Sequence, residues 1–204
     1  NADGTIVTNK TQAKEAMEVK AKEFTQNTST YTEGNLTIDA DKVTLKGNGT
    51  QAGNILITGD LENEVNIYSG NDINIGKGLV NKSGQIVAER NISVNNKADN
   101  KDLLYAKNNI TIGKELDNTG NIQSNGSIKT GGNTTNTGKI LSEKELEING
   151  KLTSSGTVYG KNKAEIKGNL DNSGDIQSEG NITAGNTKNT GRIISDKNIE
   201  ISGN

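Results

Sequence analysis

Apolar residues recur in pairs two positions apart, and the pairs return every 17 to 19 residues along the chain. This alternation is the period of a β-strand with one buried face. Eleven pairs follow one another in the same phase, which predicts one short strand in each of eleven similar units. The aliphatic members of these pairs are expected to point inward: Met17, Val19, Leu36, Ile38, Ile55, Ile57, Ile73, Ile75, Ile92, Val94, Ile110, Ile112, Ile128, Leu146, Ile148, Ile166, Ile182, Ile199 and Ile201.

A second apolar column precedes each pair by six residues. Counted from a first position at Leu61, Val80, Ala98, Leu116, Thr134, Leu152, Leu170 and Thr187, an aliphatic residue stands six places on and a small residue eight places on. Each unit therefore holds two or three short strands separated by turns. The second column adds further residues to the expected core, among them Ile122, Ile140, Ile176 and Ile193.

One segment carries a competing signal. Residues 11–24, TQAKEAMEVKAKEF, have high helix propensity, which favours a helix there. The same residues enter the repeat without a gap, and this places Met17 and Val19 over later apolar pairs. Tertiary context overrides local propensity, so we expect a strand.

A unit of about 18 residues is too short for a strand and a packed helix, so neighbouring units must stack to bury their apolar faces. The stacking that suits short strands is an all-β parallel β-helix, a solenoid of about eleven turns that forms a single repeat domain over residues 1–204. Such a coil has a narrow core. This agrees with a chain that is only 29% hydrophobic and 2% aromatic.

The turn residues support this fold. Asn recurs two places into the unit and is expected to form a ladder of side-chain amides along the axis. Gly or Asn precedes many of the paired strands, for example at Gly53 and Asn108, where a corner is expected to need positive φ. The chain has 25 Gly and no Pro, which would interrupt hydrogen bonding between turns.

Two segments show the unit most clearly: LDNTGNIQSNGSIKT at residues 116–130 and LDNSGDIQSEGNITA at residues 170–184. The unit L-x-N-[ST]-G-x-I-x-[SA]-x-x-x-I-x-[IT] resembles the haemagglutinin repeats of filamentous-haemagglutinin-like exoproteins. The resemblance covers nearly the whole chain and is weaker before Asn54, where residues 47–53 break the pattern.

The resemblance implies a right-handed parallel β-helix in the stalk of an adhesin or contact-dependent inhibition protein. Members of this family are virulence-associated proteins of Gram-negative bacteria. They are exported by two-partner secretion through an outer-membrane transporter and are secreted or held at the cell surface. The family's secretion domain and toxin are not found in this sequence, so the chain is expected to be a fragment of a longer fibrous protein without enzymatic activity.

The four tyrosines all fall seven places into their unit, between two inward positions, and should point outward. An exposed apolar stripe can mark a partner surface, here for a host or bacterial receptor or a glycan. The other interpretation is that these residues simply suit exposed strands. The candidate interaction face comprises Tyr31, Tyr68, Val87, Tyr105, Leu141, Tyr159 and Ile194, with Thr50 in the same column.

The sequence gives little support for metal binding, catalysis, nucleic-acid binding or membrane insertion. The chain has no Cys and no His, so thiolate and imidazole metal ligands are excluded and no cofactor is expected. The acidic residues Glu143, Glu145, Glu147 and Glu165 are mixed with lysines, which indicates a solvated face rather than a hydrolytic pair. A net charge of −2 gives no basic footprint for nucleic acid, and no apolar run is long enough for membrane insertion. A β-helix enzyme and a cytoskeletal β-helix polymer remain the alternatives.

Overall fold

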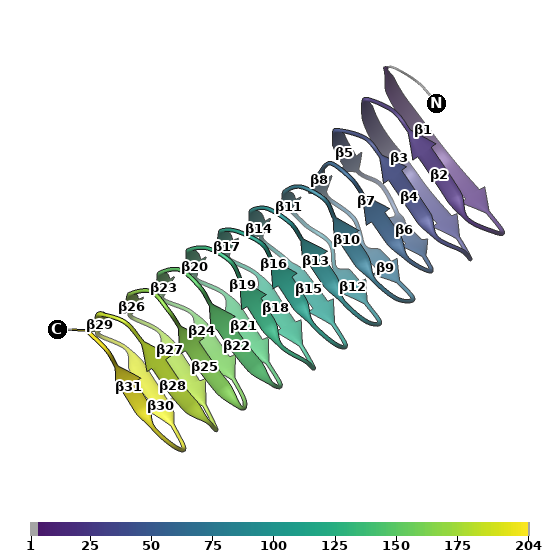
Figure 1. Cartoon of the computed structure of the whole chain (residues 1–204). Coiled ribbons are helices and arrows are strands. Elements are labelled where there is room, and N and C mark those ends of the chain that lie inside the picture. The colour runs from purple at the N-terminus through teal and green to yellow at the C-terminus, as the bar shows by residue number, and fades with distance from the viewer. Residues whose placement is uncertain (1–3, 204) are drawn as a thin grey trace.

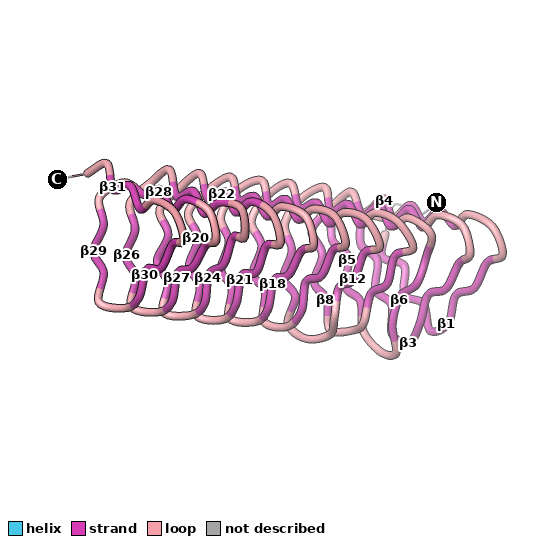
Figure 2. Tube along the Cα trace, turned by 90° about the horizontal axis from the view of Figure 1, so that it is seen from below, coloured by secondary structure: helices cyan, strands magenta, loops and turns pink. Residues whose placement is uncertain are grey.

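The computed structural model describes residues 4–203, and this part of the chain is an all-β parallel β-helix without any α-helix. Each turn of the coil, here called a rung, contributes strands to three faces of the rod (Figures 1 and 2). Every strand pairs in parallel with the equivalent strand of the next rung, about 18 residues away. The two ends of the chain lie at opposite ends of the rod (Figure 1).

The faces are numbered in the order in which the chain passes through them within one rung. The apolar pairs that recur in the sequence form the sheet of the third face. It is an eleven-stranded parallel sheet with unbroken register from Met17 to Ile201. Its strands are β2 (Met17–Lys20), β4 (Leu36–Asp39), β7 (Ile55–Ile57), β10 (Ile73–Ile75), β13 (Ile92–Val94), β16 (Ile110–Ile112), β19 (Ile128–Thr130), β22 (Glu145–Ile148), β25 (Lys163–Ile166), β28 (Asn181–Ala184) and β31 (Ile199–Ile201).

The first and second faces share one sheet because two long strands, β1 (Thr5–Ala13) and β3 (Glu23–Thr32), continue around the corner between them. Later rungs break at this corner. The first face then holds β5 (Lys42–Leu45), β8 (Asp60–Asn63), β11 (Leu79–Asn81), β14 (Ala98–Asn100), β17 (Leu116–Asn118), β20 (Thr134–Asn136), β23 (Leu152–Ser154), β26 (Leu170–Asn172) and β29 (Thr187–Asn189). The second face holds β6 (Gly49–Ala52), β9 (Ile67–Ser69), β12 (Ile86–Ala88), β15 (Leu103–Ala106), β18 (Asn121–Ser124), β21 (Lys139–Ser142), β24 (Thr157–Gly160), β27 (Asp175–Ser178) and β30 (Arg192–Ser195).

The core is one narrow cluster along the axis, built from columns of mainly aliphatic side chains that all three faces contribute. Leu36, Ile38 and the expected inward residues that follow, as far as Ile182, are buried, while Met17, Val19 and Ile193 are half-buried. The expectation of burial is wrong for Ile199 and Ile201, which are 46% and 49% exposed. They belong to the last described rung, and a side chain in this fold is covered only when rungs lie on both sides of it.

The segment with helix propensity is extended, because Met17 and Val19 pair with Leu36 and Ile38 of the next rung. In this fold a helix at that place would leave one edge of β4 unpaired. The burial of Phe24 at the start of the following rung agrees with the strand assignment.

One register assignment is corrected. Leu79, not Val80, pairs with Leu61 and Ala98 and is buried, while Val80 is 37% exposed on the outside. The extra residue of this rung lies in the corner between β11 and β12, where Gly84 takes a positive φ of 87°. Two adjacent apolar residues made both registers possible from the sequence.

The expected asparagine ladder runs inside the rod at the end of the first-face strands. Asn63 Nδ2 donates to Asn81 Oδ1 at 2.9 Å, and Asn81 and Asn100 continue the series to Asn118 and Asn136. These amides are 0–1% exposed. Except at Asn81, the Nδ2 group also donates to a carbonyl two residues on, as in the 2.7 Å bond from Asn100 Nδ2 to the carbonyl of Asp102. The ladder therefore buries polar groups without leaving them unpaired.

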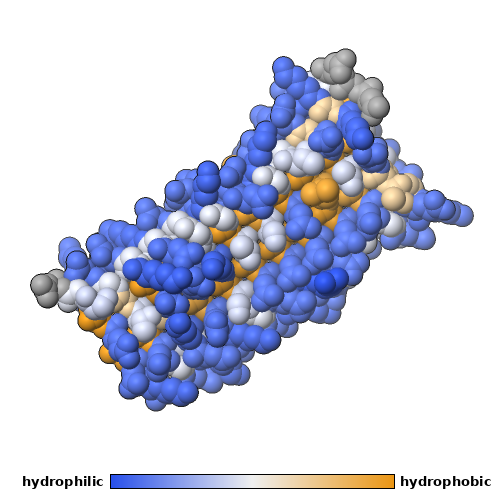
Figure 3. Space-filling model, in the orientation of Figure 1, coloured by the Kyte–Doolittle hydropathy of each residue, from blue (hydrophilic) through white to orange (hydrophobic). Residues whose placement is uncertain are grey.

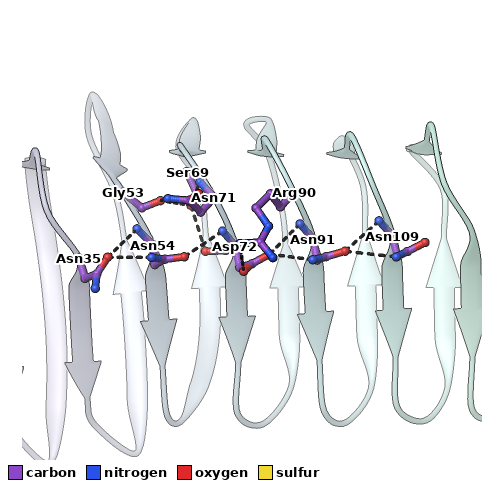
Figure 4. A network of polar contacts seen from close by, with 9 residues as sticks. All are labelled: Asn35, Gly53, Asn54, Ser69, Asn71, Asp72, Arg90, Asn91 and Asn109. Atoms are coloured by element: carbon purple, nitrogen blue, oxygen red, sulfur yellow. Dashed lines mark hydrogen bonds and ion pairs between the residues drawn. The ribbon is translucent and has the colours of Figure 1, made fainter.

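A second ladder, which the sequence reading missed, lies outside the rod at the corner before the third face (Figure 4). Asn54 Nδ2 donates to Asn35 Oδ1 at 2.8 Å, and Asn91 Nδ2 donates to Asp72 Oδ1 at 2.8 Å. Asn109 extends the series. The same side-chain oxygens accept backbone N–H groups of the next rung, so this ladder supplies partners for corner amides that no strand can pair.

Most corners need glycine because there is no room for a Cβ atom, and not because the backbone takes a positive φ. Among the described residues only Gly47, Gly49 and Gly84 have positive φ, so the expectation of positive φ at positions such as Gly53 is wrong. The rungs instead approach so closely that a Cβ on Gly138 would lie 1.9 Å from the carbonyl oxygen of Gly120.

We expect Ile122→Asp, and equally Ile176→Asp, to lower the free energy of unfolding by at least about 3 kcal/mol. Each change loses the burial of an isoleucine and places an unpaired charge in a dry core. Thermal unfolding followed by circular dichroism measures the effect. Asn121→Asp on the exposed side of the same strand is the control and should change stability little. Equal melting temperatures for Ile122→Asp and the control would contradict the core assignment.

We expect Gly138→Ala to destabilise the rod by about 1–3 kcal/mol, because the backbone must move to admit the methyl group. Gly70→Ala is the matched control. Its Cβ would meet nothing closer than 3.7 Å, so the change should stay within about 0.5 kcal/mol. Denaturant titration compares the two, and similar midpoints would show that close approach does not select glycine at these corners.

Candidate functional site

The tyrosine column lies on the second face, with its side chains directed outward. Register pairing along the face runs through Gln12, Tyr31, Gln51, Tyr68, Val87, Tyr105, Gln123, Leu141, Tyr159, Gln177 and Ile194. Thr50 does not belong to this column. It is buried, and Gln51 occupies the outward position between Tyr31 and Tyr68.

The structure brings two of the four tyrosines together. Tyr31 and Tyr68 line one hollow of about 310 Å³, with Gln51 on the strand between them. Asn48 and Asn66, from the corners that enter β6 and β9, also line it. Tyr68 is 39% exposed and Gln51 is exposed, so the hollow is open to solvent. We call it the Tyr31–Tyr68 hollow.

The corner before β6 shapes one edge of the hollow. Gly47 and Gly49 adopt φ values of 93° and 139°, which residues with a Cβ rarely adopt. Beneath them lies Gln26, which is fully buried. Gln26 Nε2 donates to the carbonyls of Lys46 and Gly49 at 3.2 Å each, and its Oε1 accepts from Thr50 Oγ1 at 2.9 Å. Gln26 occupies the asparagine position of the preceding rung, on β3, and its longer side chain reaches the carbonyls of this corner, whose own rung has Leu45 at that position.

Tyr105 and Tyr159 lie elsewhere and have partners of their own. Asn125 Nδ2 donates to Tyr105 Oη at 3.0 Å, and Tyr159 Oη donates to Glu179 Oε1 at 2.8 Å. Burial and the neighbouring carboxylate raise the pKa of Tyr159 to about 12. Each ring thus leans toward the next rung. Neither contributes to the Tyr31–Tyr68 hollow.

The remaining apolar members of the column do not form one continuous patch. Val87 and Leu141 are half-buried between their neighbours on the face, and Ile194 is 40% exposed on β30. On the side of the rod that Figure 3 shows, hydrophilic residues dominate and hydrophobic atoms form a band along the rod. On the second face, Gln51, Gln123 and Gln177 interrupt the apolar column, so the candidate interaction face reduces to local sites.

Another hollow, of about 490 Å³, lies on the first face around Val80. Gly78 lacks a side chain there, and five charged residues surround the opening: Lys42, Asp60, Glu62, Lys97 and Asp99. Several of these charges are already paired, such as Lys97 with Asp117 at 2.5 Å. The hollow has no set of convergent groups that selects one ligand.

The carboxylates of the third face form surface ion pairs. Glu147 Oε1 lies 2.5 Å from Lys167 Nζ and 3.2 Å from Lys129 Nζ, and the hydrogen bond from Lys167 is the main cause of a lowered pKa at Glu147. Glu165 pairs with Lys163 at 2.8 Å. These charges neutralise one another, between rungs at Glu147 and within strand β25 at Glu165.

Within residues 4–203, no group of three acidic residues is placed to hold a metal ion. No helix in this range is long and apolar enough to cross a membrane. Comparison with known proteins gives no relative: no family model, curated protein or solved structure matches this chain.

The raised pKa of Tyr159 predicts a separate step in an alkaline titration. The folded chain should keep this phenol protonated between about pH 10 and 12, where an unfolded tyrosine has released its proton. Because the folded state binds the proton more tightly, its contribution to stability is lost as pH rises through this window. Phenolate absorbance should show a step near pH 12 that Tyr159→Phe removes. An unchanged absorbance near pH 12 in Tyr159→Phe would contradict this prediction.

Proposed function

We propose that this chain is a non-catalytic stalk segment of a secreted or cell-surface exoprotein. One observation carries the proposal: from β1 to β31 each rung pairs only with its neighbours, which makes a rod of uniform section about 50 Å long. Such a rod separates what lies at its two ends. The repeat unit further supports an adhesin or contact-dependent inhibition protein of the filamentous-haemagglutinin type, exported by two-partner secretion through an outer-membrane transporter of a Gram-negative bacterium.

A second function, adhesion to a receptor or glycan through the second face, is favoured by the Tyr31–Tyr68 hollow. Two outward aromatic rings and three exposed amides converge there on one opening. On a stalk, such a site adds attachment along the length of the rod to whatever the rod carries at its end.

A change in the length of the rod tests the proposal that the chain is a stalk segment. Removing residues 116–169 deletes 54 residues, or three rungs, and joins Glu115 directly to Leu170. The shortened chain should fold, and small-angle scattering should show a rod shorter by about 14 Å. At a cell surface, a tag fused after the rod should remain displayed.

The control removes residues 116–160, 45 residues, and joins Glu115 to Lys161 at the corner before the third face. This places inward residues outward and should prevent folding. The stalk proposal fails if the in-register deletion folds but abolishes display of the tag, since a spacer tolerates changes of length.

A further inference from the structure

We propose that the Tyr31–Tyr68 hollow binds a neutral saccharide. This inference rests on the second function proposed above, adhesion through the second face, and it names the chemical class of the ligand. Three properties of the hollow support it: the absence of charge, the spacing of the rings and the convergence of amides.

The hollow is uncharged in a chain of which 24% is charged. None of its lining residues is Lys, Arg, Asp or Glu. Three other hollows among residues 4–203 each contain at least three charged residues: five around Val80, three near Leu170 and three near Ile166. Glu89 and Lys107 lie beside the Tyr68 hydroxyl, but they pair with each other and do not line the hollow. An ionic ligand within the lining would lose water without meeting an opposite charge. A neutral ligand has no such penalty.

The two rings are spaced for an extended ligand. Tyr31 and Tyr68 occupy equivalent positions two rungs apart, which corresponds to roughly 9.6 Å along the axis. Gln51 stands on the intervening rung. A tyrosine ring offers a flat apolar surface with a hydroxyl at its tip. The C–H face of a pyranose matches that surface, and an oligosaccharide laid along the rod can reach both rings.

The amides suit hydroxyl groups. The side chains of Gln51, Asn48 and Asn66 each carry both a donor and an acceptor, as vicinal sugar hydroxyls do. Asn66 is held in place because its Oδ1 accepts the backbone N–H of Gln85 at 3.0 Å, which leaves the Nδ2 hydrogens for a ligand.

The edge of the hollow is built before any ligand arrives. Gln26 and the two positive-φ glycines fix the corner that carries Asn48. A preformed site loses less conformational freedom on binding, which matters for a shallow opening with few contacts.

The test titrates the purified chain with neutral oligosaccharides (lactose, maltotriose, mannobiose) and with anionic counterparts (sialyllactose, a heparin disaccharide), followed by amide NMR shifts. We expect at least one neutral probe to saturate shifts around Gln51. Tyr31→Ser and Tyr68→Ser should each weaken binding by at least about tenfold, and the matched controls Tyr105→Ser and Tyr159→Ser should leave it unchanged. Thermal unfolding of each variant checks that it is folded.

Three results would overturn the inference. The first is the absence of amide shifts with every neutral probe at about 50 mM, a concentration that is fifty times the Kd of a site with a Kd of 1 mM. The second is tighter binding of the anionic probes. The third is an equal loss of binding in the control variants Tyr105→Ser and Tyr159→Ser.

Attachment of chain-coated beads to cells separates this inference from the function on which it rests. Attachment that is lost with Tyr31→Ser and Tyr68→Ser and blocked by the neutral probe supports both. Attachment lost with the same variants but insensitive to saccharide and to glycosidase treatment overturns the saccharide inference and keeps adhesion through the face. Attachment that survives every tyrosine variant overturns the adhesion proposal itself.

Discussion

Parallel stacking at one strand spacing governs every other feature of this protein. Each rung must present its backbone groups to the next at about 4.8 Å, so each side chain lies directly over its counterpart. Aliphatic residues then pack into a continuous file, and asparagines at one position bond from rung to rung. Glycine is required where two backbones meet at a corner, since a Cβ would collide with the carbonyl below. A short unit with little apolar content becomes stable because its neighbours complete it.

The same constraint separates the two sides of each strand. Inward positions such as Ile122 and Ile140 are fixed by the file that they share, whereas outward neighbours such as Gln123 and Leu141 vary between polar and apolar. Variation on the outside changes the chemistry of the surface without changing the rod. The Tyr31–Tyr68 hollow is one result of this freedom, and it lies beside the corner between β5 and β6, which Gln26 supports from the asparagine position of the preceding rung.

The fold, the core and the inner asparagine ladder could be predicted from the sequence, because residues that stack on one another in successive rungs recur at the repeat spacing in the sequence. The pairs from Leu36/Ile38 to Ile110/Ile112 gave both the fold and the core, and the recurrence of Asn63 and Asn100 gave the inner ladder. The register was predicted less well where two neighbouring residues of similar polarity could both occupy the same position of the repeat. Leu79 and Val80 are both apolar, and Thr50 and Gln51 are both polar, so periodicity alone placed each pair one residue off. The hollow could not be foreseen, because it depends on the φ values of Gly47 and Gly49 and on a hydrogen bond from Gln26.

The direction of the bonds between rungs has a mechanical consequence. Because the strands run across the rod, the hydrogen bonds that join rungs point along its axis, and an axial pull loads them in tension, one rung after another. A rung that peels away frees about 18 residues, which can extend by roughly 60 Å, more than the whole folded rod. Under load such a segment would lengthen stepwise and dissipate force instead of snapping, and it would rewind when the pull relaxes.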